Sequence, residues 1–446
     1  MKERLRVAIN AQLKPDGGSG GVVTVLRALA ALAGLDDGPE EYVFIAPHDS
    51  TEWLRSILPP GQTIVRGPAP VESSADRLEP FKRALGPLRP AARGLRRILD
   101  ATVQTAESGA SRLASSKSLA PRRPKNFYEG LGCDVIHFPF QSYAPCGLPT
   151  VYNPHDLQHL HHPEFFTPAE IGLREALHPA ACRAAHTVVV ASEFVKRDLV
   201  ERYHVEPQKI QVIPWAPPPP DFTAAEDFSA LGRKYGLSGR PFALYPAMTW
   251  EHKNHVRLLE ALAALRDRDG LKISFVFTGY KTDFWPRVER RVNELGLEGQ
   301  VDFLGMVARE ELSALYRAAQ FVFVPTLFEA ASAPLFEAWQ HGAPVACSSV
   351  TSLPEQAAGA ALLFDPFGVE TIARALARMA TEEGLRDELR QSGARRLDDF
   401  SLERTAKAYR AVYRRAAGHT LGEEDRRLLS WDWTRRSATA RRPGVD

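Results

Sequence analysis

The sequence predicts an α/β protein built from two Rossmann-like domains that face each other across a cleft. Three observations support this fold class. Short apolar runs typical of buried strands alternate with helical patterns through most of the 446 residues. Four consecutive prolines at 217–220 interrupt the alternation once, and it then begins again. In both halves, strands end in loops of small or polar residues, and such ends form the edge at which open parallel sheets bind ligands.

The composition limits the classes of function. The formal net charge is +2, so no overall positive field would attract nucleic acid, and we expect no nucleic-acid partner. The four cysteines form no C-x-x-C pair, which favours a reducing compartment. Residues 1–10 are typical of a first strand and not of a signal peptide, and no apolar run approaches the roughly 18 residues that span a bilayer. We therefore expect a cytoplasmic protein.

The first half opens with a strand, a glycine loop and a helix. Residues 5–9 are apolar, residues 16–21 read D-G-G-S-G-G, and residues 22–32 have helical spacing. This order is typical of nucleotide-binding domains, in which glycine lets the backbone approach a phosphate. The dinucleotide fingerprint is incomplete, because no acidic residue clearly ends the next strand. Gly20 and Gly21 therefore indicate either a phosphate-binding loop or a tight turn.

Residues 72–125 differ in character from the rest of the chain. They hold twelve Lys and Arg against five Asp and Glu, and apolar residues recur at helical spacing between 81 and 99. A basic amphipathic helix of this kind can lie on an anionic membrane, so peripheral contact with the inner face of the membrane is one interpretation. The prolines in the segment favour the other interpretation, a flexible surface insertion.

Histidines follow the strand at 150–152. His155 stands at the ligand-binding end of that strand, and His159, His161 and His162 come soon after it. A metal site would need a motif such as H-E-x-x-H or acidic or Cys partners at ligand spacing, and neither occurs. We therefore predict no metal site. The one D-x-D pair, at 267–269, falls at a helix end away from the ligand edge and is interpreted as a surface feature.

The second half is organised around residues 328–337, F-E-A-A-S-A-P-L-F-E. An apolar strand at 321–324 precedes this stretch. Pro334 is typical of the first turn of a helix, with Ser332 or Ala333 as its cap. A small-residue loop that leads into a helix N-terminus suits the binding of a phosphate.

Two carboxylates flank this loop. Glu329 lies at its start, and we place Glu337 in the first turn of the helix. Carboxylates accept hydrogen bonds from sugar hydroxyls, so the pair suits a polyol; the alternative is two solvated carboxylates beside a helix start. Lys253, in the polar loop after the strand at 242–246, adds a positive charge at the same edge, where it can stabilise a departing phosphate without a metal.

The expected domain organisation follows from these elements. We expect an N-terminal Rossmann-like domain, a proline-rich linker, a C-terminal Rossmann-like domain, a helix that packs back on the N-terminal domain, and a disordered tail. Their ranges are 1–216 with the basic insertion 72–125, 217–227, 228–400, 401–418 and 419–446.

With these residues in view, the chain resembles the retaining glycosyltransferases of family 4, the glycosyl transferases group 1, which have the GT-B fold. The family phrase F-E-G-F-G-L-P-x-x-E-A corresponds to F-E-A-A-S-A-P-L-F-E-A at 328–338. The similarity runs from the first strand to about residue 415. Further matching motifs are K-N at 253–254, F-L-G at 303–305, G-A-P-V at 342–345, S-L-P-E at 352–355, H-D-L at 155–157 and S-E-F at 192–194.

The resemblance implies roles for the matching residues. Glu337 would bind the ribose hydroxyls of the nucleotide, and Glu329 would hold the hydroxyls of the donor sugar. Lys253 would neutralise the diphosphate, and His155 would contact the donor sugar near the reacting carbon. The remaining donor-binding residues would act through their backbone: Gly20, Gly21, Met306, Val307, Ser332 and Ala333.

The chain departs from the family at two places. Ala330, Ala331 and Ser332 replace the glycines and the aromatic of the family phrase, which restricts the backbone of the loop. Many members have an Arg shortly before the Lys, where this chain has Met248 and Thr249. Another cation, Arg287 or Lys281, would then have to supply the missing charge.

The resemblance implies transfer of a hexose from a nucleoside diphosphate sugar to a hydroxyl of a carbohydrate or lipid-linked acceptor, with retention and without a metal or cofactor. Such enzymes often build surface polysaccharide, lipopolysaccharide or glycolipid. Two alternatives stay open: a sugar-nucleotide epimerase of the same architecture, and a homologue that binds nucleotide sugars without turnover. The base, the sugar and the acceptor are not fixed by any residue.

Overall fold

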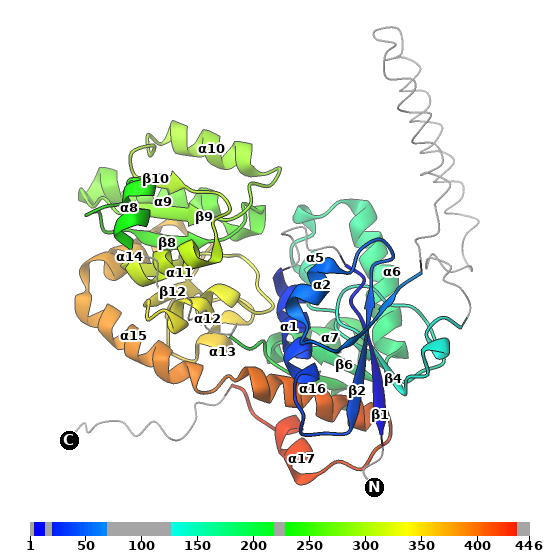
Figure 1. The fold of residues 1–446 in the computed structure, drawn as a ribbon. Helices are drawn as coiled ribbons and strands as arrows, with labels where there is room; N and C mark the ends of the chain where they lie inside the picture. The colour runs from blue at the N-terminus through cyan, green and yellow to red at the C-terminus, as the bar shows by residue number, and fades with distance from the viewer. Residues whose placement is uncertain (1–3, 14–19, 69–125, 218–227, 435–446) are drawn as a thin grey trace, which may run out of the picture.

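The computed structural model of the protein describes residues 4–13, 20–68, 126–217 and 228–434. These residues form two α/β lobes side by side, one blue to cyan and one green to orange in Figure 1. Several sequence interpretations fall outside the described residues: the basic segment 72–125 with its membrane contact, Gly17 and Gly18, nearly all of the linker, and the end of the tail at 435–446.

The N-terminal domain is a seven-stranded parallel sheet in the order β3-β2-β1-β4-β5-β6-β7. Its strands are β1 Leu5–Asn10, β2 Glu40–Ala46, β3 Thr63–Arg66, β4 Val135–Phe138, β5 Thr150–Tyr152, β6 Thr187–Val190 and β7 Ile210–Val212. Its helices are α1 Gly20–Ala33, α2 Glu52–Ile57, α5 Gln158–His161, α6 Pro168–Ala184 and α7 Glu193–Tyr203. The central strands are apolar almost throughout because helices cover both faces of a parallel sheet.

The C-terminal domain is a six-stranded parallel sheet in the order β10-β9-β8-β11-β12-β13. Its strands are β8 Ala243–Pro246, β9 Phe275–Thr278, β10 Val301–Phe303, β11 Phe321–Val324, β12 Val345–Ser348 and β13 Leu362–Phe364. Its helices are α8 Phe228–Tyr235, α9 His255–Asp269, α10 Trp285–Glu294, α11 Arg309–Ala318, α12 Ala333–Gln340, α13 Leu353–Ala357, α14 Val369–Thr381 and α15 Glu383–Leu397. The prediction of two Rossmann-like domains is confirmed.

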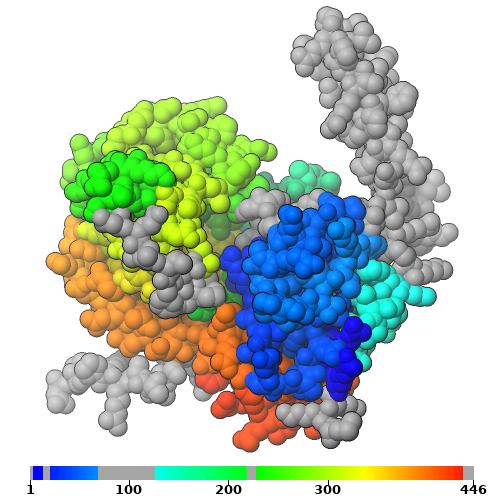
Figure 2. All heavy atoms as spheres, viewed as in Figure 1, coloured from blue at the N-terminus to red at the C-terminus, as the bar shows by residue number. Residues whose placement is uncertain are grey.

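The last helices return to the N-terminal domain. Helix α16 (Leu402–Ala416) begins at Ser401, whose side chain accepts a hydrogen bond from the N–H of Arg404, and it packs on α1. In the space-filling view (Figure 2), orange-red residues near the C-terminal end lie against the blue lobe. Two tyrosines of α16, Tyr409 and Tyr413, are buried in the same apolar cluster as β1 and β2. Helix α16 therefore packs on the first domain after the chain has passed through the whole of the second.

The prediction of a disordered tail is wrong for residues 419–434. Helix α17 (Glu423–Leu429) packs on α16, and Asp425 accepts hydrogen bonds from Arg414 at 3.0 and 3.1 Å. Trp433 is buried against Phe400 of the C-terminal domain. Sequence periodicity missed this segment because its contacts are a few specific pairs and not a regular apolar face.

Buried neutral histidines make stability depend on pH. Burial lowers the pKa of His137, His178 and His255 from 6.5 to about 3. At these three sites the unfolded chain therefore binds up to three more protons than the folded chain between about pH 3 and pH 6.5, so their stabilisation is fully present above pH 6.5 and is lost as the pH falls. We expect these three histidines alone to lower the free energy of unfolding by up to about 4 kcal/mol per pH unit in this range.

Urea unfolding followed by circular dichroism at pH 7.5, 6.5 and 5.5 measures this effect. A midpoint that is the same at pH 7.5 and pH 5.5 would contradict it. His48→Gln is the matched control, because the His48 side chain is exposed and its replacement should leave the pH dependence unchanged.

Candidate functional site

The loops at the carboxyl edge of the C-terminal sheet are tied to one another. The N–H of Thr249, after β8, donates to the carbonyl of Tyr280, after β9, at 3.1 Å. The N–H of Gly279 donates to the carbonyl of Gly305, after β10, at 2.8 Å. Asn254 donates from its side-chain amide to carbonyls after β11 and β13, Pro325 and Pro366, both at 2.9 Å. The edge is thus a continuous, hydrogen-bonded rim.

Lys253 and Glu329 meet on this rim. Lys253 ends the 3₁₀ turn η5 (Glu251–Lys253), and its Nζ lies 2.5 Å from Oε1 of Glu329. Both side chains are mostly covered, at 18% and 13% exposure. The backbone of Glu329 is fixed as well, because its carbonyl accepts from the hydroxyls of Thr351 at 2.7 Å and Ser352 at 2.8 Å. The structure therefore places this cation and this carboxylate in direct contact.

Helix α12 begins with the predicted cap, but one of the backbone N–H groups at its start already has a hydrogen-bond partner. Ser332 is the N-cap and Pro334 lies in the first turn. The N–H of Ser332 donates to Oε1 of Gln356 at 2.8 Å, so this amide already has a partner. Of the two backbone amides expected to bind a phosphate, that of Ser332 is thus paired within the protein, and that of Ala333 is the other candidate. The Ser332 hydroxyl is buried and has no hydrogen-bond partner among the described residues.

Glu337 lies one turn further into α12 than expected. It is the fifth residue of the helix, and no acidic residue stands in the first turn. Its Oε2 accepts a hydrogen bond from the Tyr316 hydroxyl at 2.7 Å. Its side chain also lines a cavity between the domains with Ala333, and α1 contributes Thr24 and Arg27 to the same cavity. Glu337 thus faces the N-terminal domain from the second turn of the helix.

His155 and Gly21 come together on the opposite side. His155 has a left-handed backbone, with φ of 66°, and its Nε2 donates to the carbonyl of Pro139 at 2.8 Å. Burial lowers the pKa of His155, so the ring is neutral and Nδ1 is an acceptor. A Cβ on Gly21 would lie 2.7 Å from Trp215 and 3.9 Å from Nδ1 of His155. Trp215, and not only a ligand, therefore requires glycine at this position.

Gly20, Met306 and Val307 have simpler surroundings. Gly20 is the first residue of α1. Met306 is 68% exposed in the loop after β10, and Val307 beside it is partly buried.

Within the described ranges, no hydrogen bond, ion pair or ring contact joins the Lys253–Glu329 pair to the His155–Gly21 pair. The two groups lie on different domains.

The two cations that could replace the family's Arg both have neighbours within the C-terminal domain. Thr249 is fully buried, and its hydroxyl accepts from the N–H of Thr282 at 2.8 Å, so its position leaves no room for an arginine. The ammonium of Lys281 lies over the ring of Trp285, and Arg287 lies 3.5 Å from Glu251. Both candidates thus have partners on the rim.

The described residues contain neither a cluster of metal ligands nor a membrane-spanning helix. In the part of the chain that the structure describes, no three His, Cys, Asp or Glu side chains are placed to share a metal ion. Asp267 and Asp269 are exposed at the end of α9, each paired with the arginine before it, as expected for a surface feature. Searching the same residues finds no helix with the length and apolar character needed to cross a bilayer.

The two halves match known family models. Residues 229–396 match the model for Glycosyl transferases group 1, and residues 107–216 match the model for Glycosyltransferase Family 4. The chain belongs to the group 1, family 4 glycosyltransferases. The glycosyltransferase is 27% identical over 275 residues to O-antigen chain mannosyltransferase B of Escherichia coli, which covers 58% of this chain and 69% of that protein.

A second relative and a solved structure are also similar to this chain. D-inositol 3-phosphate glycosyltransferase of Salinispora arenicola is 30% identical over 246 residues, which cover 51% of this chain and about half, 54%, of that protein. Among solved structures, Anabaena Alr3699/HepE in complex with UDP and glucose has a TM-score of 0.62 at 16% identity, covering 92% of this chain and 99% of that one. This structural likeness shows the GT-B fold.

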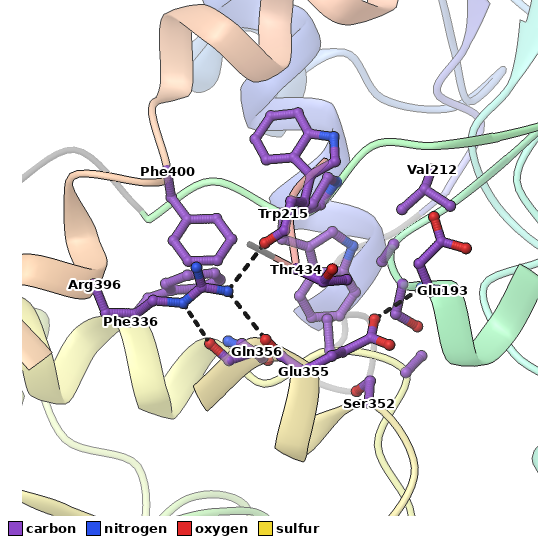
Figure 3. Close-up of a pocket in the computed structure, with 16 residues that line it drawn as sticks. Glu193, Val212, Trp215, Phe336, Ser352, Glu355, Gln356, Arg396, Phe400 and Thr434 are labelled. Atoms are coloured by element: carbon purple, nitrogen blue, oxygen red, sulfur yellow. Dashed lines mark hydrogen bonds between the residues drawn. The ribbon is translucent and has the colours of Figure 1, made fainter. Parts of the chain in front are cut away.

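The domains of the glycosyltransferase are also joined by residues that the sequence interpretation did not single out. Glu355, on α13, accepts hydrogen bonds from the N–H groups of Glu193 at 2.8 Å and Phe194 at 3.2 Å, at the N-terminus of α7 (Figure 3). Phe328 lies against the rings of His161 and Phe194. Glu355 closes the matching S-L-P-E motif, so the motif could have identified it; Phe328 gave no signal of a partner.

A small cavity lies between the domains beside the loop at 330–331 (Figure 3). Ala330 and Ala331, which replace a glycine and the aromatic of the family phrase, line it from the C-terminal domain. Trp215 and Val212 line it from the N-terminal domain. Since none of Lys253, Glu329 or His155 lines this cavity, we assign it to the contact between the domains and not to the reacting groups.

Removing the Glu355 carboxylate should loosen the contact between the domains. Burial raises the pKa of Glu355, while the two N–H donors oppose that rise. In Glu355→Ala, both donors lose their acceptor at a cost of roughly 1–3 kcal/mol. We expect a larger radius of gyration by small-angle X-ray scattering.

Glu370→Ala is the matched control, because Glu370 is an exposed carboxylate, at 59%, paired with Arg268 on one domain. It should leave the scattering profile unchanged. An unchanged profile for Glu355→Ala as well would show that this contact does not hold the domains together.

Proposed function

We propose that this glycosyltransferase moves a hexose from a nucleoside diphosphate sugar to a hydroxyl of a carbohydrate or lipid-linked acceptor, with retention at the anomeric carbon and without a metal ion. The contact of Lys253 with Glu329 beside the N-terminus of α12 supports this best. A cation and helix N–H groups suit a diphosphate, and carboxylates suit the hydroxyls of a sugar and a ribose.

We assign each site residue a role that its position and its hydrogen-bonding groups allow. The ammonium of Lys253 and the N–H of Ala333 bind the diphosphate, Glu329 holds sugar hydroxyls, and Glu337 holds the ribose. His155 accepts a hydrogen bond at Nδ1 from a sugar hydroxyl, since its Nε2 donates to Pro139. The loops of Gly20 and Gly21 and of Met306 and Val307 approach the diphosphate or acceptor and the base, respectively.

The proposed reaction is a displacement on one face of the sugar. The bond from the anomeric carbon to the phosphate oxygen breaks as the acceptor oxygen bonds to the same face, and the departing phosphate takes the acceptor's proton. Negative charge grows on the phosphate during this step. Lys253 counters that charge from a partly buried position, where an ammonium acts more strongly than in water.

The names of the relatives suggest which donor sugar and which acceptor class to test first. One is named for O-antigen chain mannosylation and another for glycosylation of an inositol phosphate, so mannose is the first donor sugar to test and a surface polysaccharide or glycolipid the first acceptor class. The structural neighbour with UDP and glucose supports a nucleotide-sugar donor.

Incubation with GDP-mannose, UDP-glucose and related donors tests the proposal. We expect slow release of free nucleoside diphosphate that continues in the presence of EDTA, because no metal takes part in the proposed step. A new sugar isomer without release would instead support an epimerase. Binding without turnover for every donor and acceptor would support a binding-only homologue.

Substitutions separate the two charged roles. Lys253→Met should lower kcat by roughly 10²-fold, because it removes charge stabilisation of the leaving group. Glu337→Ala should weaken nucleotide binding by roughly tenfold, because it removes the acceptor for ribose hydroxyls. Lys272→Met, at an exposed position before β9, should change neither value. Unchanged nucleotide affinity in Glu337→Ala would refute the ribose assignment.

A further inference from the structure

Glu337 is held in place by a tyrosine from the neighbouring helix. Tyr316, on α11, donates its hydroxyl to Oε2 of Glu337 at 2.7 Å. The tyrosine is buried, at 1% exposure, and its ring stacks on His341, with centroids 5.4 Å apart and planes within 10°. His341 in turn donates from Nδ1 to the backbone carbonyl of Glu337 at 2.7 Å. The side chain and the backbone of Glu337 are thus both fixed.

The direction of the Tyr316 hydrogen bond is also fixed. A carboxylate only accepts hydrogen bonds, so the phenol must donate. Burial raises the pKa of Tyr316 well above its usual value, and the nearby Glu337 raises it further, so the phenol keeps its proton at any working pH. The bond is charge-assisted and lies in a buried setting, which makes it one of the stronger kinds.

Away from Tyr316, Glu337 faces a cavity. Its side chain lines the cavity between the domains with Ala333 of its own helix and with Thr24 and Arg27 of α1. A carboxylate has about four lone-pair positions, of which Tyr316 occupies one on Oε2. The remaining positions can accept from two neighbouring hydroxyl groups without displacing the tyrosine.

We propose that Tyr316 is a positioning residue that orients the Glu337 carboxylate for the two hydroxyls of the donor's ribose. This inference rests on the proposed function and extends it to a residue that touches no substrate. Without the phenol, Glu337 would sample several rotamers and would lose order before it could accept both hydroxyls. Tyr316 therefore makes the site selective for ribonucleotides over nucleotides that lack these hydroxyls.

The test compares Tyr316→Phe with the unaltered protein in calorimetric binding of UDP, GDP and ADP and of their 2′,3′-dideoxy forms. The ring and its stacking are retained, and only the hydroxyl is lost. We expect the affinity for the ribonucleotide that binds to fall about tenfold and the affinity for its dideoxy form to change by less than about twofold. The donor KM should rise while kcat at saturating donor stays within about threefold.

The ratio of ribonucleotide to dideoxynucleotide affinity is measured within one protein preparation, so partial misfolding does not imitate the effect. Tyr235→Phe is the matched control: Tyr235 donates to Glu311 at 3.1 Å in the same domain, and its loss should leave the ratio unchanged. In a Glu337→Gln background, Tyr316→Phe should no longer alter the ratio.

Three results would overturn the inference. Equal loss for both nucleotide forms would mean that Tyr316 has only a structural role. No loss for either form would mean that Glu337 needs no support. If the unaltered protein binds neither UDP, GDP nor ADP, the proposed function itself fails, which is recognised before any variant is compared.

Discussion

A chain of buried hydrogen bonds holds helix α16 on the first sheet. The Tyr413 hydroxyl donates to Nδ1 of His137, Nε2 of His137 donates to Asn153, and the Asn153 amide donates to Tyr409 at 3.1 Å. Each of these buried polar groups thus has a hydrogen-bond partner. Polar groups are tolerated in an apolar interior only when they are paired in this way. Because α16 follows the whole C-terminal domain, this docking fixes where that domain returns to the first sheet. Asn153 lies two residues before His155, so the same bonds also anchor the strand end that presents the histidine.

The contact between the domains is made of specific groups near the site. Glu355 satisfies two N–H groups at the start of α7, and Phe328 packs on N-terminal aromatic rings. Glu329 follows Phe328 directly, and Ser352, which binds the Glu329 carbonyl, is three residues before Glu355. The residues that hold the domains together are therefore neighbours in sequence of those that would hold the donor sugar. A shift between the domains would move the donor loop, so the two properties are not independent.

Much of the fold and part of the site could be predicted from sequence. Both sheets follow from apolar runs, and the Lys253–Glu329 pair follows from the rule that parallel strands bring their carboxyl ends to one edge. Three features could not be predicted. Gly21 is required by Trp215, which comes from a distant part of the chain. The Ser332 amide is taken by Gln356 through a pairing of side chain and backbone, and the Tyr316–Glu337 bond joins two helices. Local periodicity contains no information on such long-range pairs.

The charge on the rim of the C-terminal sheet is distributed differently from the family pattern, and the structure gives the reason. Thr249 is fully buried and bonded to Thr282, so the loop after β8 carries Lys253 as its cation facing Glu329. Arg27 lines the cavity beside Glu337, but it belongs to α1 of the other domain. A guanidinium raises the potential in that cavity only while the domains stay together, because its effect falls off within about 8 Å in physiological salt. The electrostatics of this site therefore depend on domain contact, and hence on the Glu355 carboxylate and the buried bonds of α16.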